Sequence, residues 1–215
     1  MTHKRQRIII TITGCPTIYE IGKILDSHNI VAYSKFLRGL NEDYTHEYEF
    51  LNPKAKQSKL SGYLLPDTYE FFTSEDPKKV IRKFLTNFDN KVYKKIKLEI
   101  EDKNYTLHDY LIMASILAKE AKNIDDAKII SGIFWERLKM GIPLQADAIN
   151  IFSDFDSYKN KGLPPDPLCN PETGYILASI YPKKTNYLFF FYNSKNKLIL
   201  SKTLLEHTIN LEINK

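Results

Sequence analysis

The sequence predicts an α+β fold, with short strands near both ends of the chain and helices between them. The β-branched run "RIIITITG" predicts a strand over residues 7–14. Residues 186–203, "NYLFFFYNSKNKLILSKT", predict two strands around a polar turn. Between these segments, apolar residues recur mainly at helical spacing. At 215 residues, the chain is long enough for one large domain or two modest ones.

The first half of the chain contains three predicted helices. Apolar residues at helical spacing predict one over residues 15–30 and a shorter one beginning in residues 34–40. Residues 41–60 are polar and are interpreted as a connection or domain boundary. Residues 62–71 are apolar and are interrupted by a proline. The third predicted helix, over residues 76–96, is amphipathic.

The second half begins with two helices that we expect to pack as an antiparallel hairpin. Residues 106–123 open with a Thr-x-x-Asp capping box. Residues 124–141 have two acids in the first turn and a glycine at the end, and the connection between the two helices is short. Residues 142–173 are rich in proline and are predicted to be a loop. A last helix is predicted within residues 174–182, which end in a proline.

The composition excludes several classes of protein and of site. An apolar share of 43% and a charged share of 27% are typical of a globular protein. The net charge of +5 is spread along the chain without a basic stripe, so we expect no nucleic-acid partner. No apolar run reaches the roughly 18 residues of a transmembrane helix, and the first one reads as a strand rather than a signal peptide. Cys15 and Cys169 lie far apart and make no metal-ligand spacing, so they suggest neither a disulfide framework nor a zinc site.

Glu120 has an unusual setting in "ASILAKEAKN". Its neighbours three and four residues away on a helix are Ile116, Leu117, Asn123 and Ile124, and none is basic. One interpretation is a general acid whose pKa is raised by apolar surroundings. The other is a glutamate at a helix end that extends its carboxylate into water. Periodicity alone favours the second interpretation.

Polar residues in the predicted loops are further candidates. Gln145 and Asp147 lie in "GIPLQAD", and Asn170 follows the prolines of "GLPPDPLCNPET", with Tyr158 nearby. These side chains could bind sugar hydroxyls, but turn chemistry and rigid connections explain them equally well when each is taken alone.

Other chemistries lack their signatures in the sequence. There is no glycine-rich phosphate loop and no Gly-x-Ser-x-Gly elbow. The five histidines are isolated from one another along the chain, which favours neither a metal site nor a Ser–His pair. They are His3, His28, His46, His108 and His207. We therefore expect no cofactor and no metal.

Four ordered segments together resemble the MltG/YceG-like endolytic murein transglycosylases. They are "GYLLPDTYEF", "MASILAKEA…GIFWERLKMGIPLQAD", "SYKNKGLPPDPLCNP" and "YLFFFY…LSKTLLEH", and the likeness runs over residues 8–211. The family typically has a cytoplasmic tail, one transmembrane helix and a LysM-like module before its catalytic domain. The resemblance therefore implies a partial, N-terminally truncated LysM-like module over residues 1–57 and a YceG-like catalytic domain over residues 58–215. Ser61 and Leu198 depart from the family pattern, which usually has glutamate and histidine there.

The resemblance also implies roles for individual residues. The catalytic glutamate of the family lies in a helix with two glutamates flanking a lysine, and these positions are Ala118 and Glu120 here. Glu120 is therefore the expected catalytic acid. Gln145 and Asp147 match the family's Leu-Gln-x-Asp motif, and Asn170 matches the polar residue of its Gly-Leu-Pro-Pro motif. The expected substrate-binding residues are Gln145, Asp147, Tyr158 and Asn170.

The implied function is endolytic cleavage of the β-1,4 bond between N-acetylmuramic acid and N-acetylglucosamine, which leaves 1,6-anhydro ends. The alternative is an inactive remnant of the same fold that binds peptidoglycan without cutting it. Peptidoglycan strands are the expected partner, and the cell-wall synthesis machinery is a further candidate. The family is anchored in the inner membrane with its catalytic domain outside the cytoplasm, whereas this chain shows neither a transmembrane helix nor a signal peptide.

Overall fold

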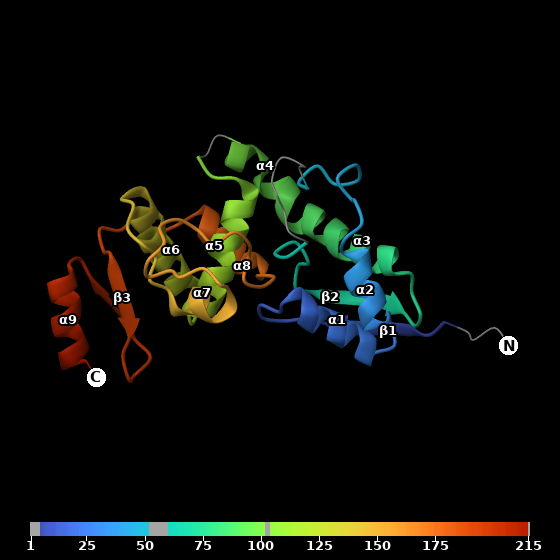
Figure 1. Cartoon of the computed structure of the whole chain (residues 1–215), viewed down its shortest axis with the longest axis horizontal. Coiled ribbons are helices and arrows are strands. Elements are labelled where there is room, and N and C mark those ends of the chain that lie inside the picture. The colour runs from blue at the N-terminus through green and yellow to red at the C-terminus, as the bar shows by residue number, and fades with distance from the viewer. Residues whose placement is uncertain (1–4, 52–59, 102–103, 215) are drawn as a thin grey trace.

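A computed structural model describes residues 5–51, 60–101 and 104–214. The molecule is elongated, with the first helices and strands at one end and the last at the other (Figure 1). The first half comprises β1 (Arg7–Thr11), α1 (Ile18–Ser27), α2 (Tyr33–Gly39), β2 (Thr68–Phe72), α3 (Pro77–Phe88), the π-helical turn η1 (Asp89–Tyr93) and α4 (Lys94–Glu101). The second half comprises α5 (Leu107–Glu120), α6 (Ile124–Lys139), α7 (Asp147–Phe152), α8 (Thr173–Ile180), β3 (Phe189–Tyr192), β4 (Leu198–Ser201) and α9 (Leu204–Ile213). This mixture of helices and strands confirms the predicted α+β class.

The first hydrophobic core lies beneath a two-stranded sheet. β1 pairs antiparallel with β2, so that Ile10 faces Tyr69 across the pair. Alternate residues of the strands point inward, and Ile10, Tyr69 and Phe71 are buried with the apolar faces of α1 and α3. Strand β1, in the first segment of the chain, therefore forms its sheet with β2, which follows residue 60. The domain boundary predicted at residue 57 lies outside the described residues.

The central helices pack around α5, which carries Glu120 at its C-terminal end. Thr106 and Asp109 make the predicted capping box, in which the Thr106 hydroxyl accepts from the Asp109 N–H. Every residue from Tyr110 to Leu117 is buried, as expected for a helix that is apolar on all sides. α6 and α8 both pack against α5, which fixes the position of its C-terminal end.

Two helices lie where the sequence predicted none. α7 lies inside segment 142–173, which was predicted to be a loop, and its six residues are too few to show a helical period. α9 follows β4 and has no buried residue. It packs on β3 and β4, and these three elements form the C-terminal end of the molecule (Figure 1). The two strands themselves confirm the prediction for residues 186–203.

The sequence suggested no disulfide framework, but Cys15 and Cys169 form a disulfide. Their Cα atoms lie 5.3 Å apart although 154 residues separate them in the chain. The backbone N–H of Asn170 and its side-chain amide both donate to the carbonyl of Pro16, at 2.8 and 2.9 Å. The segment after β1 is therefore fastened to the segment before α8. The spacing of the two cysteines in the sequence does not reveal this contact, because tertiary folding brings the two segments together.

Among the described residues, no helix is both long enough and apolar enough to cross a bilayer.

Candidate active site

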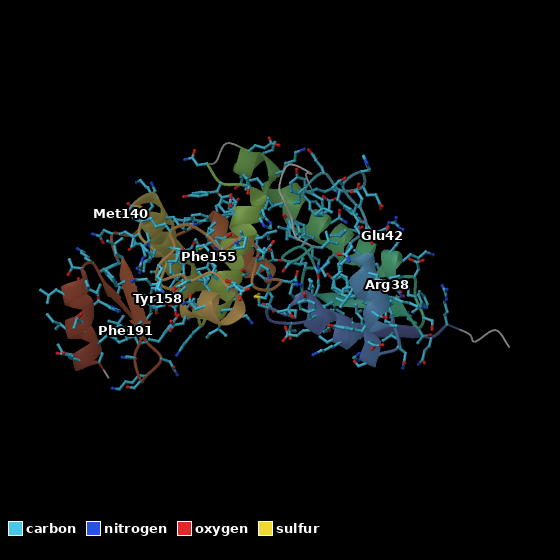
Figure 2. All side chains as sticks on the ribbon, in the orientation of Figure 1. Arg38, Glu42, Met140, Phe155, Tyr158 and Phe191 are labelled. Carbon is cyan, nitrogen blue, oxygen red and sulfur yellow. A yellow bond between two sulfur atoms is a disulfide. The ribbon has the colours of Figure 1, made fainter. Side chains whose placement is uncertain are left out.

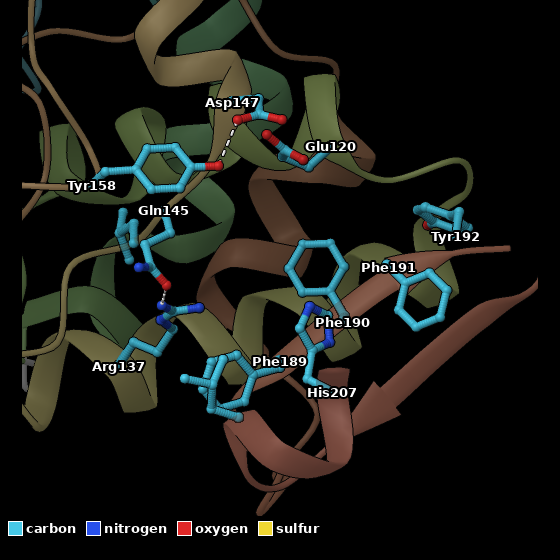
Figure 3. Close-up of a pocket in the computed structure, with 12 residues that line it drawn as sticks. Glu120, Arg137, Gln145, Asp147, Tyr158, Phe189, Phe190, Phe191, Tyr192 and His207 are labelled. Carbon is cyan, nitrogen blue, oxygen red and sulfur yellow. Dashed lines mark hydrogen bonds between the residues drawn. The ribbon is translucent and has the colours of Figure 1, made fainter. Parts of the chain in front are cut away.

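A pocket of about 360 Å³ opens between the end of α5, the start of α7 and the C-terminal end of the molecule (Figure 3). Four of the five predicted site residues line it: Glu120, Gln145, Asp147 and Tyr158. Arg137, Leu144, Phe189, Phe190, Phe191, Tyr192, Leu204 and His207 complete the lining. Figure 2 places Tyr158 and Phe191 in the same part of the molecule, beside the central helices. The pocket therefore gathers side chains from segments that are far apart in sequence.

Glu120 is the last residue of α5. The next residue, Ala121, is extended, so Asn123 and Ile124 are not its helical neighbours as the sequence suggested. The other two expected neighbours, Ile116 and Leu117, are fully buried and form the apolar support beneath the end of the helix. Glu120 itself is half-buried and faces the pocket.

The carboxyl of Glu120 experiences opposing electrostatic effects. Burial raises its pKa above the ordinary value, and the negative charge of Asp147 raises it further. The N–H of Ala148, in the first turn of α7, donates to Glu120 Oε1 at 3.1 Å and opposes this shift. The net effect is a raised pKa, which agrees with the direction expected from the apolar surroundings. A carboxyl of this kind keeps its proton to higher pH than an exposed one.

Asp147 lies beside Glu120 in the pocket (Figure 3). The hydroxyl of Tyr158 donates to Asp147 Oδ1 at 2.7 Å. This hydrogen bond to a carboxylate, together with burial, raises the pKa of the Tyr158 phenol. Tyr158 is 49% exposed, so its ring forms an accessible edge of the pocket. The pair presents an ionisable acid and an aromatic face to a ligand.

Gln145 is held in a backbone conformation that is unusual for its side chain. Its φ is +53°, in the left-handed region. The Gln145 N–H donates to the Ser157 carbonyl at 2.9 Å, and Ser157 also exchanges hydrogen bonds with the backbone of Ala146. Because Arg137 Nη2 donates to Gln145 Oε1, the amide nitrogen of Gln145 remains available to the pocket. Strain held by such contacts is common at functional sites.

The sequence did not single out the opposite wall of the pocket. Arg137, on α6, is only 4% exposed and donates to the carbonyls of Pro143 and Leu188 at 3.1 and 3.3 Å. His207, on α9, stacks on Phe189 with ring centroids 5.4 Å apart. In the sequence, Arg137 reads as one of several charges on an amphipathic helix and His207 as an isolated histidine. The two side chains come together in the pocket only because α6 and α9 both approach β3 in the folded chain.

Asn170 is the one predicted site residue that lies outside the pocket. It is fully buried, and its Oδ1 accepts from the N–H groups of Gly62 and Leu64 at 2.8 and 3.0 Å. Its amide nitrogen donates to Pro16. With these partners, Asn170 joins three chain segments and has no exposed surface for a sugar. These hydrogen bonds hold the three segments together.

The arrangement suits proton transfer to a polar ligand. It offers one half-buried carboxyl with a raised pKa, a second carboxyl beside it, an amide and a wall of aromatic rings. Within the described residues, no group of three or more His, Cys, Asp or Glu side chains is arranged to hold a metal ion.

Comparison with known proteins places the whole chain in one group. The model of the YceG-like family matches residues 1–212. A protein of Bacillus subtilis named endolytic murein transglycosylase is 32% identical over 165 residues, which are 69% of this chain and 46% of that protein. A protein of the same name from Streptococcus pneumoniae is 29% identical over 189 residues, covering 73% of this chain and 33% of its own length. The chain therefore spans less than half the length of these curated relatives.

The fold is also similar to a solved structure. The crystal structure of a yceG-like protein from Listeria monocytogenes superposes with a TM-score of 0.78 at 27% sequence identity. The match covers 94% of this chain and 74% of that one.

Proposed function

The chain belongs to the YceG-like family, and we propose that it is an endolytic lytic transglycosylase that cuts the glycan strands of peptidoglycan. The names of the relatives support the substrate and the class of reaction. The observation that carries the proposal is the setting of Glu120, a half-buried carboxyl with a raised pKa that opens into a pocket next to a second acid.

In the proposed mechanism, Glu120 acts twice. It first donates its proton to the oxygen that bridges N-acetylmuramic acid and N-acetylglucosamine, and the glycosidic bond breaks. The resulting Glu120 carboxylate then takes the proton from the 6-hydroxyl of the same muramic acid, whose oxygen bonds to C1. This step closes a 1,6-anhydro ring and returns Glu120 to its acid form, so no water enters the product. The raised pKa favours the protonated form that starts the cycle.

The neighbouring residues have positioning roles in this proposal. Gln145 offers its amide nitrogen to a sugar oxygen, because its amide oxygen is engaged by Arg137. Asp147 and Tyr158, joined by a hydrogen bond, contact hydroxyls on the opposite edge. Replacement of Gln145 or Asp147 should lower activity less than loss of Glu120, because neither transfers the proton.

We also propose a location for the chain outside the cytoplasm and a module assignment for its N-terminal segment. The Cys15–Cys169 disulfide suits an oxidising compartment outside the cytoplasm, where a catalytic domain would meet peptidoglycan. Residues 1–57 are proposed to be part of a LysM-like module, whose strand β1 here pairs with β2 of the catalytic domain.

The products of digestion test the proposal. Isolated peptidoglycan is incubated with the chain, and the soluble fragments are weighed by mass spectrometry. Fragments with 1,6-anhydro ends are expected. Fragments heavier by one water would instead show hydrolysis, with Asp147 as the second carboxylate that such enzymes use. Sedimentation of the chain with peptidoglycan, without any fragments, would support the inactive binding remnant.

The pH profile of cleavage should depend on Asp147. The charge of Asp147 raises the Glu120 pKa, so Asp147→Asn should lower it. Because the acid form starts the reaction, the alkaline limb of kcat/KM should then move to lower pH. The asparagine keeps an oxygen that accepts from Tyr158. Asp125→Asn, which removes a carboxylate that is 93% exposed on α6, is the matched control and should leave the limb in place. An unmoved limb in Asp147→Asn would contradict the coupling of the two acids.

A further inference from the structure

We infer that the wall of the pocket formed by Arg137 and His207 binds a carboxylate on the substituent that muramic acid carries at its third carbon. The inference rests on the proposed function, since it takes a peptidoglycan strand as the occupant of the pocket. It adds to that function a subsite that distinguishes charged from uncharged muramoyl groups.

Arg137 is a buried cation whose hydrogen bonds leave its charge uncompensated. Its three acceptors among the described residues are the carbonyls of Pro143 and Leu188 and the amide oxygen of Gln145, all of which are uncharged. A guanidinium has five N–H groups, so two remain after these three bonds. Burying a charge without an opposite partner is costly, and buried charges are ordinarily paired. An anionic ligand would supply the missing partner.

The free N–H groups are directed to a place that a ligand can reach. Arg137 lines the pocket, and Figure 3 shows a guanidinium nitrogen extending from it on the side of Phe190 and His207. Phe189 also covers the guanidinium, with its ring centroid 5.3 Å from the central carbon. The ring shields the cation from water, and a charge-assisted hydrogen bond made there is stronger than one made in solvent.

His207 provides a second donor at the same wall. Its Nδ1 is buried and has no hydrogen-bond partner among the described residues. A buried N–H without a partner is rarer than a buried acceptor without one, which favours the neutral tautomer that has its proton on Nε2. Burial and the charge of Arg137 lower the His207 pKa, which favours this neutral form. Since the ring lines the pocket, Nε2 is the nitrogen that remains to donate to a ligand.

The two charged walls divide the pocket by chemistry. Glu120 and Asp147 lie on one wall, and Arg137 and His207 lie across from them (Figure 3). An anion would be repelled by the acids and attracted by the opposite wall, so it would orient the sugar that bears it. Muramic acid differs from glucosamine in its lactyl ether, whose carboxyl group is free or extended by a peptide that ends in carboxylates. A carboxylate in this subsite would therefore place a muramic acid, rather than a glucosamine, beside Glu120.

Binding of defined oligosaccharides to the Glu120→Gln chain tests the inference without cleavage. Three tetrasaccharides of alternating glucosamine and muramic acid are compared by titration calorimetry. One has free lactyl carboxylates, one has them as neutral N-methylamides, and one carries stem peptides. The free carboxylate or the peptide form should bind about tenfold to a hundredfold more tightly than the N-methylamide. Whichever of the two binds more tightly identifies the source of the carboxylate.

Variants locate the effect within the pocket. Arg137→Gln should abolish the preference for carboxylate, and His207→Phe, which keeps the aromatic stacking, should reduce it. Arg82 lies on the distant helix α3 and forms an ion pair with Glu47. Arg82→Gln should therefore leave the preference for carboxylate unchanged. The comparison of ligands needs no variant at Arg137, so it stands even where Arg137→Gln fails to fold.

Equal affinity for the carboxylate and N-methylamide forms, or no binding of any form, would overturn the inference. The proposed function is tested separately, by measuring whether the wild-type chain cleaves intact peptidoglycan.

Discussion

Glu120→Gln is expected to reduce cleavage of peptidoglycan by about 10²- to 10⁴-fold, the usual contribution of a positioned acid or base. The amide has nearly the same volume as the acid and can still accept from the N–H of Ala148. It cannot, however, donate a proton to the glycosidic oxygen or take one from the 6-hydroxyl. The release of anhydro-ended fragments over time, measured by mass spectrometry, gives the rate.

Thermal unfolding shows whether the variant loses chemistry or fold. The Glu120 pKa is higher in the folded chain than in the unfolded one, so between these two values the folded chain binds more protons than the unfolded chain. Its contribution to stability is full below the ordinary carboxyl pKa of about 4.3 and is lost as pH rises through the folded value. Gln has no such titration. The Tm of Glu120→Gln should therefore equal or exceed that of the wild type at pH 7, and the difference should disappear near pH 4.

Lys119→Gln is the matched control for Glu120→Gln. Lys119 is the adjacent residue on α5, but its side chain is exposed and its ammonium donates to the carbonyl of Cys15 rather than facing the pocket. Cleavage by this variant should stay close to that of the wild type. Wild-type activity in Glu120→Gln, or equal loss in both variants, would contradict the assignment of Glu120.

The sequence predicted those features that depend on neighbours along the chain. Helix α5 and its capping box follow from residues within one segment, and so does the paired strand motif of β3 and β4. The apolar setting of Glu120 was visible for the same reason, although the end of the helix removed two of its expected neighbours. Features of this kind need only the periodicity of one element.

Features made by distant segments were not predictable in this way. The disulfide joins residues 154 positions apart, and Arg137 meets His207 only where α6 and α9 approach β3. Asn170 was assigned to the site because it matches the polar residue of the family's Gly-Leu-Pro-Pro motif, and in the structure its amide group bonds to backbone groups of two other segments. A polar residue in a proline-rich loop serves binding and folding equally well by sequence, and only its partners distinguish the two.

Gly132→Ala is expected to destabilise the fold by about 3 kcal/mol, the cost of overpacking against atoms that cannot move aside. A Cβ atom built on Gly132 would lie 2.1 Å from the carbonyl oxygen of Lys183. That oxygen belongs to a backbone segment held against α6, where the Lys183 N–H donates to the carbonyl of Lys128 at 2.9 Å. The methyl group would therefore displace backbone. For a chain of this size, the Tm should fall by about 6–12 °C.

The same substitution should also weaken cleavage, because the displaced segment leads directly into the pocket. Residues 181–188 connect α8 to β3, and the carbonyl of Leu188 accepts from Arg137. Gly174→Ala is the matched control, since it also places alanine in a helix but brings its Cβ to 2.8 Å from the side-chain tip of Ile124, which can rotate away. Because alanine favours a helix over glycine by about 1 kcal/mol, Gly174→Ala should unfold at or near the wild-type temperature. If Gly132→Ala did so as well, the segment before β3 could not lie against α6 as described, and the wall that holds Arg137 and His207 would have to be built differently.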